Sequence, residues 1–394
     1  MAGVEPAGIV SFVESPQPFV RESNATNIAC IVSRCNPMGC LVNAIGKAPL
    51  AHSRHGFIWR WPQWKEPAGH VTVRRLSLLP DIMSTMIHIT EEQVREALPM
   101  AKAIDLVEEA FRRLGDGRAV NHARRRVMLD NGAWLHFMAA GDNEGGYLAA
   151  KVYATRPRAG ARFAVLLFDA ETTELLAIID ANALGQIRTG AATGVATRCL
   201  ARPEARRLGM IGCGFQAETQ LAAIAEVRDL EMALVYSRSR ERRERFARKM
   251  SERLGIAVRA VDSARAAVSE SDAAVTITTA REPLFSADVV PAGCHINAAG
   301  SNHAKRVELD AGTVARCALV AVDSIEQARM EAGDLIQAHA AGLLDWGRVV
   351  EVSSIVSGKT PGRGSADDVT LFESQGLAIQ DLMVAAHVYR EVAA

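Results

Sequence analysis

The chain has 394 residues, of which 49% are hydrophobic and 23% are charged, and its 45 Lys and Arg residues balance 45 Asp and Glu residues. The length favours two domains, and the composition is ordinary for a globular protein. Without a basic surplus, the charge gives no support to binding of nucleic acid or of an anionic membrane, and no apolar run reaches the roughly 18 residues of a membrane-spanning helix.

The seven cysteines are odd in number and scattered, which argues against a disulfide framework and favours a reducing, cytoplasmic compartment. Cys30, Cys35 and Cys40 are evenly spaced, but they lack the paired spacing and the nearby histidines of a zinc site. We therefore expect no bound metal.

Residues 1–85 show no sustained helix or strand periodicity and lack the features of a signal peptide. We expect this stretch to be a poorly ordered extension, with the functional fold beginning near Met83 or Met86. The alternative is a small extra domain or a partner-binding arm.

After this stretch the pattern becomes regular. Residues 87–89 resemble a short strand, and Thr90 with Gln93 predicts a capping box that opens a helix. Strand-like segments follow, and their order indicates an antiparallel sheet: 126–129, 134–138, 148–153, 163–169 and 175–180.

Three basic residues in this part are candidate site residues. Lys151 interrupts an apolar strand, and burial there would lower its pKa to a value that suits proton transfer. The equally favoured alternative is that its stem packs on the strand while its ammonium group reaches water. Arg126 ends the run 124–126, which is more often a solvated surface. Arg188 follows Gln186 at the start of a helix rich in small residues and could bind a carboxylate or phosphate in a bidentate manner, or serve no site at all.

The strongest motif is a strand, a glycine turn and a helix. A buried strand at 206–211 leads into Gly212, Cys213, Gly214, Phe215, Gln216 and Ala217, and a helix pattern follows. The two glycines permit the tight turn and the approach of a pyrophosphate, and the alanine lets the helix pack close to the strand. The helix N-terminus offers N–H donors for phosphates. We predict a dinucleotide site here; a plain strand-turn-helix is the alternative.

The residues after the second strand, 232–236, bear on the choice of cofactor. An NAD site usually has Asp or Glu at this point, whereas this chain has Ser237 and Arg238. Because an Arg can face the 2′-phosphate and no carboxylate repels it, NADP(H) is favoured, with NAD(H) possible. Alternatively, Arg238 only solvates a helix start.

Further strands at 274–279, 295–298 and 318–322 alternate with helices, which predicts an α/β fold with a doubly wound parallel sheet of Rossmann type. Ligands bind beyond the carboxyl ends of such strands. We therefore expect the cofactor beside Thr278, Thr279, Gly300 and Ser301.

Several motifs together resemble the ornithine cyclodeaminase/mu-crystallin family from about Met86 to the C-terminus. The carrying stretches are 126–127, 150–151, 187–192, 212–217, 308–310 and 369–382. The resemblance implies a Rossmann domain at 201–367 and a second α/β domain, 86–200 with the C-terminal helix 368–394, that binds substrate and forms a homodimer.

The resemblance also implies roles for single residues. Arg126 and Lys151 would contact the carboxylate and the reacting centre of a small imino or amino acid. Arg188 would lie between substrate and cofactor, Thr189 would bind the cofactor, and Ser374 would line the nicotinamide end.

One position departs from the cyclodeaminases, which carry Asp where this chain has Asn302. An amide cannot exchange a proton as a carboxylate does, so Asn302 would only form hydrogen bonds. Family members similar to mu-crystallin also lack this Asp and reduce cyclic ketimines with NADPH. We therefore expect a reductase of cyclic ketimine acids; the alternatives are an ornithine cyclodeaminase, an alanine-type amino-acid dehydrogenase, or a non-catalytic NADPH-dependent binding protein.

Overall fold

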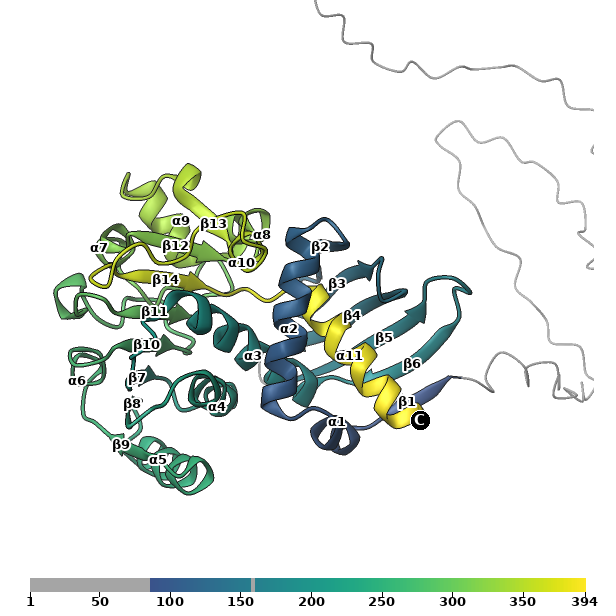
Figure 1. Ribbon diagram of the computed structural model, residues 1–394, viewed down its shortest axis with the longest axis horizontal. Coiled ribbons are helices and arrows are strands. Elements are labelled where there is room, and N and C mark those ends of the chain that lie inside the picture. The colour runs from purple at the N-terminus through teal and green to yellow at the C-terminus, as the bar shows by residue number, and fades with distance from the viewer. Residues whose placement is uncertain (1–85, 157–159) are drawn as a thin grey trace, which may run out of the picture. The chain divides into compact units, whose positions relative to one another are not determined.

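The computed structural model describes residues 86–156 and 160–394. The expectations for residues 1–85, and for the cysteines at 30, 35 and 40, lie outside the described residues. Two β-sheets organise the described chain (Figure 1).

The first sheet has six strands, and the predicted antiparallel arrangement is present except that the first strand pairs in parallel. A β-bulge between His122 and Arg125 shifts the register of its edge strand. In spatial order the strands are β1 (Ile87–Ile89), β6 (Leu175–Asp180), β5 (Gly160–Asp169), β4 (Tyr147–Arg156), β3 (Trp134–Asp142) and β2 (Ala119–Met128).

Helices cover one face of this sheet. Thr90 and Gln93 form the predicted capping box at the start of α1 (Glu91–Ala97), and the apolar stripe of α2 (Met100–Gly115) is buried. The C-terminal helix α11 (Ala378–Ala393) lies beside α2 and packs on β3, β4 and β5 (Figure 1). The last helix of the chain thus returns to its first sheet.

The second sheet has eight parallel strands, which confirms the predicted α/β class. Alternate residues of β7 and β10 enter two separate apolar clusters, so both faces of the sheet are covered. In spatial order the strands are β13 (Val349–Glu351), β12 (Leu319–Val322), β14 (Thr370–Glu373), β11 (His295–Ala298), β10 (Ala273–Thr276), β7 (Arg207–Ile211), β8 (Met232–Tyr236) and β9 (Ala257–Ala260).

Helices and two short 3₁₀ turns connect these strands. They are α4 (Ala217–Val227), α5 (Arg240–Leu254), α6 (Ala264–Val268), η1 (Ala287–Val289), α7 (Ala311–Arg316), α8 (Ile325–Glu331), α9 (Gly333–Ala340), η2 (Trp346–Arg348) and α10 (Val352–Val356). Within the part of the chain that the structure describes, no helix is both long and apolar enough to cross a membrane.

The buried helix α3 (Asn182–Leu200) runs between the two sheets. It begins at Asn182, earlier than the sequence pattern at Gln186 indicates. The cause is a tertiary cap: the Glu91 carboxylate of α1 accepts hydrogen bonds from the Asn182 and Ala183 backbone amides at 2.8 and 2.6 Å. This earlier start places Arg188 inside the helix, on a rigid element.

Candidate functional site

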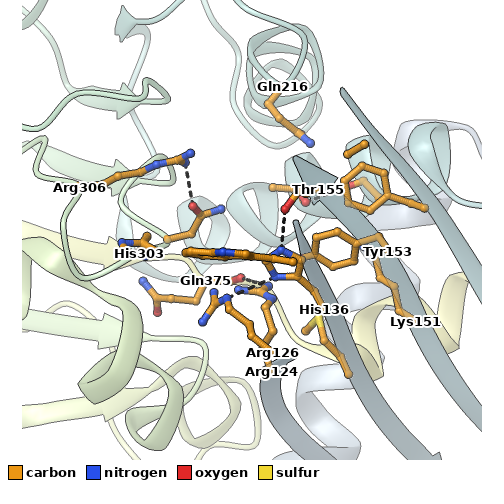
Figure 2. Close-up of a pocket in the computed structure, with 18 of the residues that line it drawn as sticks. Arg124, Arg126, His136, Lys151, Tyr153, Thr155, Gln216, His303, Arg306 and Gln375 are labelled. Atoms are coloured by element: carbon orange, nitrogen blue, oxygen red, sulfur yellow. Dashed lines mark hydrogen bonds between the residues drawn. The ribbon is translucent and has the colours of Figure 1, made fainter. Parts of the chain in front are cut away.

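A cavity of about 1190 Å³ opens between the first sheet and the carboxyl ends of the second sheet's strands (Figure 2). The predicted residues Arg126, Lys151, Arg188, Thr189, Phe215, Gln216, Asn302 and Ser374 line it. The cavity therefore brings together side chains from the two sheets, from α3 and from the glycine turn.

Lys151 lies deep in this cavity. Its side chain is only 4% exposed, so it does not reach water, and its Nζ donates to Asp381 Oδ1 of α11 at 2.8 Å. Burial lowers the pKa of Lys151 to about 8, although the Asp381 charge opposes the shift. A lysine with such a pKa exchanges protons readily near neutral pH.

Asp381 also accepts from Arg188 Nε at 3.0 Å. Burial alone would raise the pKa of Asp381, but Arg188 and Lys151 outweigh it and hold the pKa below its usual value. One carboxylate thus stabilises two cations that face the cavity.

The loop 374–377 fixes the other side of Arg188. Asp323 accepts from the Ser374 hydroxyl at 3.0 Å and from the Gly376 amide at 2.7 Å, and its second oxygen accepts from the Gln380 side chain. Gln380 in turn accepts from Arg188 Nη1 at 3.0 Å. Gly376 has φ +77° and lies against the guanidinium, so any side chain here would be strained and would collide with Arg188.

Arg124 and Arg126 enter the cavity from β2 (Figure 2). Both contact the buried carboxylate of Glu331 on α8. Arg124 donates to Glu331 at 2.6 Å and to the Gln375 carbonyl at 2.9 Å and is buried, whereas the Arg126 side chain is 20% exposed. Arg124 and Arg126 therefore belong to the cavity, whereas Arg125 between them is exposed, as expected of a solvated surface.

His136 of β3 holds the Arg126 guanidinium. Arg126 Nε donates to His136 Nδ1 at 3.2 Å, so Nε2 carries the ring proton and faces the Thr155 hydroxyl at 2.9 Å. Burial, together with the charges of Arg126 and Arg124, lowers the pKa of His136 to about 4. His136 is thus neutral at physiological pH and stacks on Tyr153 with ring centroids 4.4 Å apart.

The glycine turn has the geometry that its sequence predicts. Gly212 has φ +117°, and a side chain on it would collide with the Ile277 carbonyl, so only glycine fits. A Cβ on Gly214 would meet only open space, which leaves this backbone accessible. Ala217 is buried at the start of α4.

Ser237 and Arg238 follow β8 but line neither this cavity nor a second one. Ser237 donates to the Ser239 carbonyl at 3.1 Å, and Arg238 is exposed. The second cavity, about 460 Å³, lies beside Gly214 and Phe215 between α4 and α5. Its basic residues, absent from the sequence predictions, are Arg242, Arg245 and Lys249.

The remaining predicted cofactor residues, at the carboxyl ends of β10 and β11, lie outside the cavity lining. Glu308 is buried and accepts from the backbone amides of Thr278 at 2.6 Å and Gly300 at 2.8 Å. Ser301 is buried and donates to the Arg306 carbonyl at 3.0 Å, while Thr279 is exposed. These four residues do not line the cavity themselves.

Asn302 does line the cavity, and its Oδ1 accepts from Arg306 Nη1 at 2.9 Å. An amide in this arrangement orients neighbours and exchanges no proton. In residues 86–156 and 160–394, no group of three or more His, Cys, Asp or Glu side chains has the geometry to hold a metal ion.

The model of the ornithine cyclodeaminase/mu-crystallin family matches residues 83–394. The chain belongs to this family. The resemblance drawn from the motifs is thereby confirmed.

Two proteins named as Delta(1)-pyrroline-2-carboxylate reductases are similar to this chain in sequence or structure. A Delta(1)-pyrroline-2-carboxylate reductase of Bacillus cereus is 39% identical over 228 residues, which cover 58% of this chain and 70% of that protein. A Delta(1)-pyrroline-2-carboxylate reductase of Thermococcus litoralis, solved with NADH and L-proline, is 35% identical with a TM-score of 0.76, covering 78% of this chain and 98% of that one.

An archaeal alanine dehydrogenase, solved as a dimer with bound NAD, is also similar. It is 32% identical with a TM-score of 0.73, and the match covers 78% of this chain and 96% of that one. Similar folds therefore occur in proteins named for two different reactions, imine reduction and alanine dehydrogenation.

The sequence analysis did not predict four residues that line the cavity or contact its lining. They are Arg124, His136, Glu331 and Asp381. Asp381 carried a usable signal, because it is an acidic residue inside the apolar helix pattern 378–388, where a buried carboxylate needs a cationic partner. Glu331 and His136 carried none, since only the folded chain places them beside Arg124 and Arg126.

Proposed function

We propose that this protein is an NAD(P)H-dependent reductase of cyclic ketimine acids of the pyrroline-2-carboxylate or piperideine-2-carboxylate type. The observation that carries the proposal is the buried set of Lys151, Arg188 and Asp381, which shares one cavity with the glycine turn at Phe215 and Gln216. The relative solved with NADH and L-proline supports the same reaction class.

The residues of the glycine turn fit a dinucleotide. Gly214 leaves its backbone open to a ligand, and the N-terminus of α4 directs amide donors and positive potential toward a pyrophosphate. A bound nicotinamide cofactor would supply the hydride.

In the proposed reaction the imine carbon gains the hydride, the electron pair of the C=N bond moves to nitrogen, and nitrogen gains a proton. Arg188 and the buried Arg124 hold the substrate carboxylate and fix the imine carbon. Lys151, protonated below about pH 8, donates the proton, and Asp381 keeps its ammonium group aimed into the cavity.

Asn302 separates this chemistry from cyclodeamination. A cyclodeaminase also needs a base that activates an amine or water, and the amide at 302, bonded to Arg306, offers none. The second candidate is oxidation of an L-amino acid, the same hydride transfer in reverse, which the similarity to an alanine dehydrogenase supports.

We propose NADP(H) as the preferred cofactor. Ser237 and the exposed Arg238 follow β8 without a carboxylate, and Arg242 and Arg245 add positive charge beside the glycine turn. NAD(H) is the alternative, because similar solved structures hold NADH or NAD.

We also propose a homodimer formed through the open face of the first sheet. On the face opposite Lys151, alternate residues of β2, β3 and β4 are apolar and about half exposed: Val120, Val127, Leu135, Phe137 and Leu148. A contiguous apolar face of this kind favours a protein partner, and a second copy fits the family.

The test is a panel assay of the purified full chain with NADPH and NADH on 1-pyrroline-2-carboxylate, 1-piperideine-2-carboxylate, L-ornithine and L-alanine. We expect stoichiometric cofactor oxidation on the two imines. Release of ammonia and proline from L-ornithine with catalytic cofactor would instead establish cyclodeamination, and tight NADPH binding without turnover would leave only a binding protein.

A further inference from the structure

The cavity carries more positive charge than a single carboxylate needs. Among the described residues, its lining has no Asp or Glu, but it has eight basic side chains: Arg124, Arg126, Lys151, Arg156, Arg188, Arg281, Lys305 and Arg306. Such a surface attracts and holds anions.

Four of these cations form the inner part of the cavity, and only two carboxylates contact them. Asp381 pairs with Lys151 and Arg188, and Glu331 pairs with Arg124 and Arg126. Two positive charges remain in excess. The α-carboxylate of an imino acid matches one of them, and a second negative group on the substrate would match the other.

The sheet register separates the inner cations into two rows. Lys151 pairs with Met138, which lies opposite the β-bulge that contains Arg124, so Lys151 and Arg124 share a row. Arg126 pairs with His136 in the next row outward. Two residues along a strand span roughly 7 Å, so Arg124 and Arg126 leave β2 at different positions, and their guanidinium groups approach Glu331 from the two sides of its carboxylate.

The inner row suits the α-carboxylate. Arg124 is buried, its Nε–H has no hydrogen-bond partner among the described residues, and Lys151 lies in the same row. The imine nitrogen must lie near Lys151, so the carboxylate on the adjacent carbon lies near Arg124 and Arg188.

Arg126 is built to bind a separate group. His136 accepts from its Nε, and its Nη2 forms an ion pair with Glu331; these contacts fix the guanidinium, and Nη1 has no partner among the described residues. Because neutral His136 is an acceptor here, it orients Arg126 without repelling an anion. Figure 2 shows Arg126 beside His136 at the cavity wall.

We propose that Arg126 binds a second acidic group of the substrate, so that this enzyme prefers imino dicarboxylates to imino acids with an uncharged side chain. The inference rests on the proposed imine reduction and names its substrate class. The outer cations Arg156, Arg281 and Lys305, which form no ion pair among the described residues, strengthen the attraction for a dianion.

The test compares two open-chain imines that have the same number of carbon atoms, 2-iminosuccinate and 2-iminobutyrate. They form in the assay from ammonium with oxaloacetate and with 2-oxobutyrate, respectively. The cyclic imine 1-pyrroline-2-carboxylate is the reference substrate. Wild type should reduce 2-iminosuccinate with the highest kcat/KM. Arg126→Gln should lose about 100-fold in kcat/KM on 2-iminosuccinate while staying within about threefold on the other two imines. Arg126→Lys should retain an intermediate kcat/KM on 2-iminosuccinate, because the positive charge remains but the planar guanidinium that can donate two parallel hydrogen bonds is lost.

Arg259→Gln is the control, since Arg259 is exposed, forms no ion pair among the described residues and does not line the cavity. It should leave all three rates unchanged, and cofactor binding by fluorescence should be intact in every variant. Equal losses of Arg126→Gln on all three imines would make Arg126 an α-carboxylate anchor and overturn the inference, as would a wild type without preference for 2-iminosuccinate. If no imine is reduced with either cofactor, the proposed function fails and the inference fails with it.

Discussion

Asp381→Asn is the substitution that most sharply probes the buried cluster. The amide keeps the shape of the side chain and can still accept hydrogen bonds, but it removes the charge that lies 2.8 Å from Lys151 Nζ and 3.0 Å from Arg188 Nε. Removing one member of a buried ion pair costs about 3–5 kcal/mol. Arg188 keeps its hydrogen bond to Gln380, and Lys151 can lose its proton. We therefore expect a loss of unfolding free energy at the low end of this range, about 3 kcal/mol.

The same substitution shifts the pH dependence of catalysis. Asp381 now holds the pKa of Lys151 above the value that burial alone would impose, about 8 in the intact cluster. Reduction needs protonated Lys151, so kcat/KM falls as pH rises through this pKa. In Asp381→Asn the fall should begin at lower pH, because the ammonium has lost its counter-charge.

Urea unfolding at pH 7 and a pH profile of kcat/KM at saturating cofactor measure the two effects. Asp367→Asn is the control, since Asp367 is exposed and its carboxylate makes no hydrogen bond or ion pair with the described residues. The assigned role of the cluster would be refuted if Asp381→Asn had the same unfolding free energy as wild type and if its kcat/KM fell at the same alkaline pH.

The remaining expectations concern turnover, cofactor and assembly. Lys151→Met should abolish turnover and leave NADPH binding intact by fluorescence titration; unchanged turnover would contradict its role as proton donor. Gly212→Val should lose cofactor binding in the same titration, because its side chain would collide with the Ile277 carbonyl. Arg238→Gln should lower the kcat/KM ratio of NADPH to NADH several-fold, and an unchanged ratio would exclude Arg238 from the 2′-phosphate site. Phe137→Glu should yield monomers in sedimentation experiments, whereas a persistent dimer would assign the interface elsewhere.

Short-range signals were enough to predict the fold class and the glycine turn. The sequence from 206 to 217 contains a strand, a glycine turn and a helix start in contiguous order, and the structure forms all three. The family assignment rests on motifs of the same local kind and is confirmed. The division at residues 200 and 367 stays a prediction.

Long-range partners were beyond the sequence pattern. Lys151 and Asp381 are 230 residues apart, so whether the lysine is buried or snorkels depends on where α11 packs. The β-bulge between His122 and Arg125 likewise decides that Arg124 and Arg126 both face the cavity, because a shift of one residue exchanges the two faces of a strand. The early start of α3 depends on Glu91 from another helix.

Isotope transfer tests the central claim most directly. The full chain is supplied with NADPH or NADH carrying deuterium at the transferred position of nicotinamide C4, together with 1-pyrroline-2-carboxylate, and the proline formed is analysed by mass spectrometry and NMR. The account predicts one deuterium at the α-carbon of proline for each cofactor oxidised. Cofactor oxidation without deuterium at that carbon, or no proline at all, would contradict it.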